Sequence, residues 1–90
     1  MLIITYGRLF SYACKAMATL RDQGINVRIL KLNRIKPIPE EAVAVASRAR
    51  QVFFFEEGIQ QGGVGEHFDY LLSQNNFYGK KITHVRQGYL

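Results

Sequence analysis

The chain has 90 residues, 48% of them apolar, and its 12 lysines and arginines against 7 acids give a formal net charge of +5. This length limits residues 1–90 to one domain, and the apolar share excludes a disordered chain. No apolar run approaches the roughly 20 residues of a membrane span, and residues 1–5 lack the basic leader and cleavage site of a signal peptide. Cys14, the only cysteine, cannot form an internal disulfide, which fits the reducing environment of the cytoplasm. Because no membrane span is predicted, we expect no membrane partner.

The first half of the sequence predicts a strand, a helix and a second strand. Residues 2–6 form an apolar, β-branched run that ends at Gly7. A helix should follow and stop at Gly24, because glycine accepts the left-handed conformation at a helix end. Residues 25–32 should form the second strand. The helix has apolar side chains at spacings of three and four, which puts on one buried face Phe10, Ala13, Cys14, Met17 and Leu20.

The second strand begins the most basic part of the sequence. Its cations alternate with apolar residues, as in a strand with one solvated edge, where lysine and arginine discourage aggregation. Nucleic-acid binding is a second interpretation, which we do not favour, and contact with another domain is a third. The cations, which have no acid among them, are Arg28, Lys31, Arg34 and Lys36.

The second half predicts two more helices and two more strands. Pro39 suits the first turn of a helix, which starts with acids and ends with Arg48 and Arg50, the charge order that the helix dipole favours. Residues 52–55 are apolar throughout and predict a central strand covered on both faces. Residues 82–85 should form a short fourth strand. Between these strands, one apolar helix face is marked by Val64, His67, Phe68, Leu71 and Leu72.

Alternating strands and helices predict an α/β fold with right-handed crossovers. We expect a three-layer α/β/α domain with a mostly parallel sheet of about four strands in the order 2-1-3-4, numbered along the chain. The buried run at residues 52–55 and the apolar first strand should be central. The basic second strand should lie at an edge.

The glycines before the third helix allow two interpretations. Gly62, Gly63 and Gly65 open a helix, whose bare N–H groups could hold a phosphate. The segment matches neither a Walker A loop nor the dinucleotide fingerprint, and Glu66 beside it would repel an anion. We favour the second interpretation, in which small residues let this helix approach the sheet or a neighbouring domain closely.

Glu56 and Glu57 end the buried strand and could form an acid/base pair. Adjacent strand residues point to opposite faces, so the two carboxylates should diverge. We expect one of them to cap an N–H or to meet an arginine such as Arg8. His67 is interpreted as a core or interface residue. His84 has no second ligand at metal spacing, so no metal site is predicted.

Three segments together resemble the C-terminal domain of transketolase-like enzymes: LIITYGRL, GINVRILKLNRIKPIPEEAV and VFFFEEGIQQGGVGEHF, within residues 2–72. The segment Lys36-Pro37-Ile38 is similar to the Lys-Pro-Leu of 1-deoxy-D-xylulose-5-phosphate synthases, whereas the beta subunits of 2-oxo acid dehydrogenases, or other transketolase-like enzymes, are alternatives. The chain departs from the synthase pattern at Gly58, Asn33 and Pro39, where an asparagine, an arginine and an acid are usual. Without that acid, the helix after Pro39 loses its side-chain cap.

The resemblance implies a parent transferase that condenses pyruvate with glyceraldehyde 3-phosphate for isoprenoid synthesis, using thiamine diphosphate and a divalent metal, Mg²⁺. The family's Gly-Asp-Gly motif and its cofactor-activating glutamate lie in the preceding domains, so no catalytic, cofactor or metal residue is expected in this chain. Its partners would be those domains, in a homodimeric parent, and the chain alone should be inactive. The family also implies an antiparallel strand before Leu2 and a final helix after Leu90. A stand-alone phosphate- or nucleotide-binding module remains the alternative.

A candidate edge follows from the predicted topology. If the first and third strands are neighbours and their helices leave on opposite faces, a crevice opens at the strand ends, where α/β sheets place their sites. We expect this edge to face another domain or a ligand. Its residues are Tyr6, Gly7, Arg8, Glu56, Glu57, Gly58, Gly62, Gly63 and Gly65.

Overall fold

A computed structural model describes residues 1–57 and 63–86 and shows a parallel sheet. Its strands are β1 (Leu2–Tyr6), β2 (Arg28–Leu32), β3 (Gln51–Glu57) and β4 (Lys80–Arg86). The 4-stranded sheet has the order β2-β1-β3-β4, and every neighbouring pair is parallel. The predicted order is therefore confirmed, with the apolar strands in the centre and the basic β2 at an edge.

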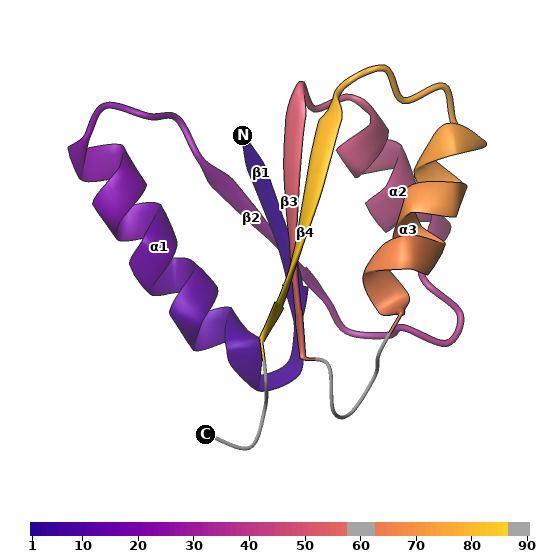
Figure 1. The fold of residues 1–90 in the computed structure, drawn as a ribbon, viewed down its shortest axis with the longest axis horizontal. Coiled ribbons are helices and arrows are strands. Elements are labelled where there is room, and N and C mark those ends of the chain that lie inside the picture. Colours follow the sequence, from indigo (N-terminus) through magenta and orange to yellow (C-terminus); the bar gives the residue numbers. More distant parts are fainter. Residues whose placement is uncertain (58–62, 87–90) are drawn as a thin grey trace.

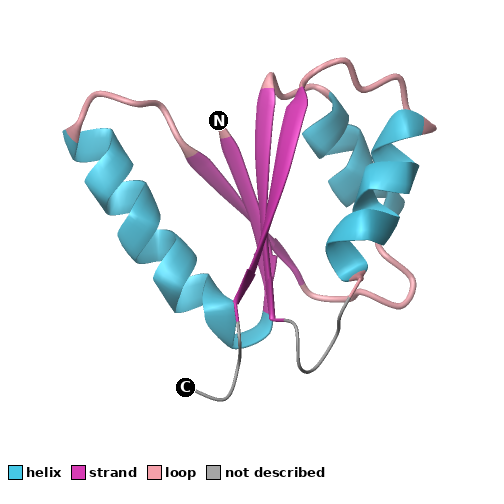
Figure 2. Ribbon diagram, viewed as in Figure 1, coloured by secondary structure: helices cyan, strands magenta, loops and turns pink. Residues whose placement is uncertain are grey.

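Helices lie on both faces of the sheet, which makes the three layers expected (Figure 1). A short 3₁₀ turn, Gly7–Leu9, leads into α1 (Phe10–Asp22) on one face. The helices α2 (Glu40–Ser47) and α3 (Val64–Ser73) lie side by side on the other face (Figure 2). The chain thus changes faces between the helix after β1 and the helix after β3.

The larger part of the core lies between the sheet and the α2–α3 layer. Phe54, with no exposed surface, lies at its centre, and its ring centroid is 5.3 Å from that of Phe68 on α3. Ala42 and Ala46 of α2 are buried in this cluster. The buried members of this cluster are Leu2, Ile4, Leu32, Ile38, Ala42, Val43, Ala46, Val52, Phe54, Phe68 and Leu72.

The opposite face of the sheet is only partly covered. There α1 packs on β1 and β2, around a small cluster of Ile3, Ala13 and Val27. Over β3 and β4, Phe53 and Phe55 are half-buried, and Ile82 is 49% exposed. The expectation that β3 is covered on both faces was therefore wrong for the α1 face, because α1 follows the β1–β2 half of the sheet.

Several element boundaries differ from the sequence prediction. β2 begins at Arg28 instead of Ile25, which is 39% exposed. α2 ends at Ser47, so Arg48 is its C-cap and Arg50 lies beyond the helix. Gly24, at φ +84°, follows α1 as expected, whereas Pro39 is the N-cap residue of α2 and precedes its first turn, without a side-chain hydrogen bond.

Candidate functional site

The carboxyl ends of β1 and β3 meet at one edge of the sheet. The two strands pair in register up to Thr5 and Phe55, so Tyr6 and Glu56 follow at the same level. The chain then leaves β1 toward α1 on one face, and β3 toward α3 on the other (Figure 1). This is the strand arrangement that opens a crevice in α/β sheets. Gly7, at φ +61°, makes the turn out of β1, and Arg8 follows it in the 3₁₀ turn.

Part of the predicted edge lies outside the described residues. Gly58, Gly62 and the side chain of Glu57 belong to that part. The remaining residues of the prediction divide into two groups. Tyr6, Gly7 and Arg8 stand at the end of β1, whereas Glu56, Gly63 and Gly65 form the junction between β3 and α3.

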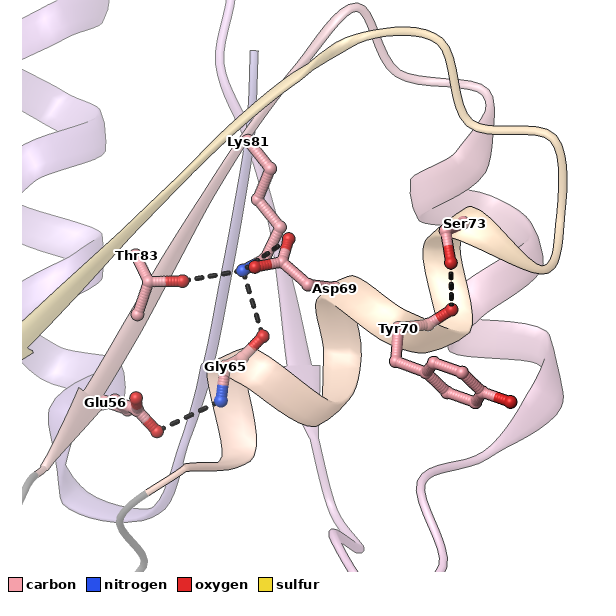
Figure 3. Close-up of polar contacts among 7 residues, drawn as sticks. All are labelled: Glu56, Gly65, Asp69, Tyr70, Ser73, Lys81 and Thr83. Carbon is pink, nitrogen blue, oxygen red and sulfur yellow. Dashed lines mark hydrogen bonds and ion pairs between the residues drawn. The ribbon is translucent and has the colours of Figure 1, made fainter.

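Glu56 is a buried carboxylate that caps α3 from the sheet. The residue is 3% exposed, and its Oε2 accepts a hydrogen bond from the Gly65 N–H at 3.1 Å (Figure 3). The N-cap residue of α3 is Gly63, at φ +87°, which has no side chain to perform this role. A carboxylate also suits the positive end of the helix dipole. The prediction that one of the two glutamates caps an N–H is confirmed for Glu56.

Gly65 lies where α3 comes closest to the sheet. A Cβ at this position would stand 2.8 Å from Thr83 Cγ2 and 2.9 Å from Thr83 Oγ1, both on β4. It would also stand 3.2 Å from Glu56 Oε1. Real Cβ atoms essentially never come within 3.0 Å of such neighbours, so with any larger residue either the Thr83 side chain or the helix would have to shift. At Gly65, the glycine serves close packing.

Lys81 completes this junction and was missed by the sequence prediction. Its side chain is 4% exposed and forms an ion pair with Asp69 at 3.1 Å. Its Nζ also donates hydrogen bonds to the Gly65 carbonyl at 3.0 Å and to Thr83 Oγ1 at 2.6 Å (Figure 3). Both backbone polar groups of Gly65 are therefore held, one by Glu56 and the other by Lys81. We call these five residues the α3 anchor: Glu56, Gly65, Asp69, Lys81 and Thr83.

A signal for Lys81 was present in the sequence. Lys80 and Lys81 are adjacent in a strand, so their side chains point to opposite faces, and one of them must point toward a helix layer. Which one does so depends on the register with β3, where Val52 pairs with Lys81. Val52 is a core residue of the α2–α3 layer, and Lys81 shares that face. The pattern alone did not supply this register.

A groove lies beside the α3 anchor, between the loop before α2 and the α3 helix. One hollow of about 320 Å³ is lined by Lys36, Gly63 and His67 together with apolar residues. An adjoining hollow of about 460 Å³ shares Pro37, Ile38 and His67 with the first. His67 is exposed, and its ring stacks on that of Tyr70 with centroids 6.5 Å apart. A core position for His67 is therefore wrong, because the face of α3 that it occupies looks into this groove.

The described residues show no arrangement that resembles a metal centre. No group of three or more His, Cys, Asp or Glu side chains converges among residues 1–57 and 63–86. His84 packs against aromatic rings, with its ring centroid 5.2 Å from that of Phe55. In the same residues, no helix is both long enough and apolar enough to cross a membrane. At the carboxyl edge, the described residues thus form a groove beside α3 and a hydrogen-bonded junction between α3 and the sheet.

Comparison with known proteins assigns the family. The sequence model described as "Transketolase, C-terminal domain" matches residues 1–89. The chain is 33% identical over 84 residues to the 1-deoxy-D-xylulose-5-phosphate synthase of Shouchella clausii. This alignment covers 92% of this chain and 12% of that protein. The corresponding synthase of Pelotomaculum thermopropionicum is 33% identical over 72 residues, 79% of this chain and 11% of its own. The chain therefore spans about an eighth of the length of these relatives or less.

Two further matches extend the comparison. One of the subunits of the apulose-4-phosphate transketolase of Phocaeicola vulgatus is 34% identical over 74 residues, 81% of this chain and 24% of that protein. A solved structure titled "Split gene transketolase, inactive beta4 tetramer" superposes with a TM-score of 0.80 over 96% of this chain and 28% of its own length. At 24% identity, this second match speaks for the fold alone. Fold and sequence agree, and the chain belongs to the transketolase C-terminal domain family.

Proposed function

We propose that this chain is the noncatalytic C-terminal domain of a cytoplasmic thiamine-diphosphate-dependent transferase similar to 1-deoxy-D-xylulose-5-phosphate synthase. The observation that carries the proposal is the match to the synthase of Shouchella clausii, in which 92% of this chain corresponds to 12% of a much longer enzyme. The parent reaction would join pyruvate to glyceraldehyde 3-phosphate with loss of carbon dioxide. In such an enzyme, this domain completes the subunit and supports a homodimer.

Neither the start of α3 nor the described side chains of residues 1–57 and 63–86 offer a fitting site for thiamine diphosphate or its metal. A diphosphate would need free N–H groups at a helix N-terminus, and at α3 the Gly65 N–H is bound to the Glu56 carboxylate. The described residues bring together no cluster of metal ligands. We therefore place both groups in the preceding domains of the parent enzyme. The same buried carboxylate argues against the alternative of a stand-alone phosphate- or nucleotide-binding module that uses this glycine segment.

The carboxyl edge is the surface that we assign to the preceding domains. Tyr6, Gly7 and Arg8 lie at the end of β1, beside the end of β3. The groove that contains Lys36 and His67 continues this surface on the α3 side. A surface with a hollow, cationic side chains and a fixed helix end can receive a neighbouring domain without rearranging its own core.

The test compares the chain alone with the chain joined to domains that carry the Gly-Asp-Gly motif and the activating glutamate. The chain alone should release no carbon dioxide from pyruvate and give no calorimetric binding signal with thiamine diphosphate and Mg²⁺. The joined protein should bind the cofactor and form 1-deoxy-D-xylulose 5-phosphate from pyruvate and glyceraldehyde 3-phosphate. Micromolar cofactor binding by the chain alone would refute a noncatalytic role. If the joined protein accepts only other 2-oxo acids or aldehydes, the domain role stands and the synthase assignment fails.

A further inference from the structure

Three arginines from two segments line one cleft at the opposite, amino edge of the sheet. Arg28 begins β2, while Arg48 and Arg50 flank the turn between α2 and β3. The cleft has a volume of about 270 Å³, and its other lining residues are Met1, Asn26 and Ala49. It contains no carboxylate among these lining residues. In Figure 1 this is the edge near the N-terminus, away from the ends of β1 and β3 that lead to α1 and α3.

The charges in this cleft are uncompensated within the described part of the chain. No described residue forms a hydrogen bond or an ion pair with the guanidinium group of Arg28, Arg48 or Arg50. Arg21 differs, since its guanidinium donates to the Val27 carbonyl at 3.2 and 2.9 Å. The sequence has no acid between residues 23 and 39 or between residues 42 and 55. Cations that face one cleft without a counter-charge repel each other, and an anion between them would remove that repulsion.

The backbone that carries these arginines is held in place. The Arg28 N–H donates to the Met1 carbonyl at 3.1 Å, and the Arg50 carbonyl accepts the Lys80 N–H at 2.9 Å. Gly79 packs against the same turn so closely that a Cβ there would stand 2.5 Å from the Arg50 carbonyl oxygen. The guanidinium groups therefore project from fixed points on two neighbouring segments. A site whose supporting backbone is already ordered loses less entropy when a ligand binds.

Two simpler roles account for single arginines but not for the cleft. Arg48 caps α2, where a cation suits the negative end of the helix dipole. Arg28 lies on an edge strand, where a charge discourages strand pairing. Neither role requires that Arg28, Arg48 and Arg50 line one hollow.

We propose that this cleft binds a phosphate group, either as inorganic phosphate or as part of a small phosphorylated metabolite. The planar guanidinium fork donates two parallel hydrogen bonds to phosphate oxygens, which makes arginine suited to this anion. The volume far exceeds the roughly 10–15 Å³ that one water needs, so the organic part of a phosphate ester fits as well. The site is separate from the carboxyl edge, and the proposal does not depend on the function proposed above.

The experiment titrates inorganic phosphate into the 90-residue chain at constant ionic strength and follows backbone amide shifts by NMR. Saturable shifts are expected at residues 26–28 and 48–50. Arg28→Gln and Arg50→Gln keep the side-chain length but remove the charge, and each should weaken binding by about tenfold, the cost of a charge-assisted hydrogen bond. Arg34→Gln is the matched control, because Arg34 lines a different hollow and its loss changes the net charge equally. It should leave the affinity unchanged.

Competing ligands decide the source of the phosphate. If glycerol 3-phosphate displaces inorganic phosphate at equal or lower concentration, the ligand is a phosphorylated metabolite; if it does not, the ligand is the free ion. Equal binding of citrate would overturn the assignment to phosphate. Displacement of phosphate by a short DNA duplex, with a steep loss of affinity as salt rises, would overturn it in favour of nucleic acid. Unsaturable shifts, or an Arg34→Gln effect as large as that of Arg50→Gln, would show only general attraction of anions.

Discussion

At the residue scale, Lys81 shows how a buried ammonium group is accommodated between a sheet and a helix. Its three N–H donors have three acceptors: Asp69, the Gly65 carbonyl and Thr83 Oγ1. The group also lies 5.4 Å from the centre of the Phe54 ring, where a cation–π attraction adds to these bonds. Complete pairing offsets the desolvation of the charge, which would otherwise be costly.

Replacing Lys81 should test this pairing directly. Lys81→Met keeps most of the side-chain volume but leaves the Gly65 carbonyl without its donor, so we expect a loss of about 1–3 kcal/mol in the free energy of unfolding. Asp69 is 58% exposed, so water can solvate it after the change. Urea unfolding monitored by circular dichroism measures the loss. Lys80→Met, at the exposed neighbouring residue, is the matched control and should lower the free energy of unfolding by less than about 0.5 kcal/mol. Equal losses in the two variants would contradict a specific role for Lys81.

At the element scale, the position of α3 is set by the sheet. The helix begins after Gly63, which offers no side-chain cap, and Glu56 on β3 supplies the acceptor instead. Lys81 and Thr83 on β4 fix the first turn from the other side. Two strands therefore determine where α3 starts and how closely it lies.

Gly65→Ala should destabilise the protein although alanine is the better helix former. The gain in helix propensity is at most about 1 kcal/mol, whereas forcing a methyl group into a filled space costs about 1–3 kcal/mol. The clash is with Thr83, whose side-chain atoms would be 2.8 and 2.9 Å from the new Cβ. The double variant Gly65→Ala, Thr83→Ala should therefore be more stable than the sum of the single effects predicts, by more than about 0.5 kcal/mol. Strict additivity in urea unfolding would show that close approach to Thr83 is not the constraint.

At the scale of the whole molecule, the sheet separates two surfaces with different chemistry. The carboxyl edge carries the ends of β1 and β3 and the groove at His67, and the amino edge carries the arginine cleft. The α1 face adds a third surface, where β3 and β4 leave Ile82 and the ring of His84 exposed. We assign the first surface to the preceding domains of the parent enzyme and the second to a phosphate group.

The assignment of the carboxyl edge predicts the effect of Arg8→Ala in the full-length parent enzyme. If Arg8 contacts a preceding domain, its loss should lower turnover, or lower subunit stability by more than about 1 kcal/mol, beyond the small effect of a surface change. Steady-state kinetics and thermal unfolding measure the two effects. Lys15→Ala, on the exposed side of α1, is the control. Unchanged turnover and stability in Arg8→Ala would leave this edge as a solvated crevice.

Much of the fold could be predicted, because the order of apolar and charged residues along a segment indicates how deeply that segment is buried. Three such predictions are confirmed: residues 52–55 lie in a central strand, the basic second strand lies at an edge, and Gly24 follows the end of α1. Each of these outcomes depends on side chains that are neighbours in the sequence. The expectation that β3 is covered on both faces was wrong for the α1 face, where Phe53 and Phe55 are only half-buried, because an apolar run does not show which helices reach a strand.

The sequence by itself determined the fold class, the strand order and the glutamate pair from which one cap would come. The tertiary structure alone decided that Glu56 is that cap, that Lys81 points inward while Lys80 does not, and that Arg28 meets Arg48 and Arg50 in one cleft. The physical reason is the range of the interactions involved. Hydrophobic periodicity can be recognised within a single segment of the sequence. A hydrogen bond or a shared cleft between two segments depends on their register, and the segments are far apart in the chain.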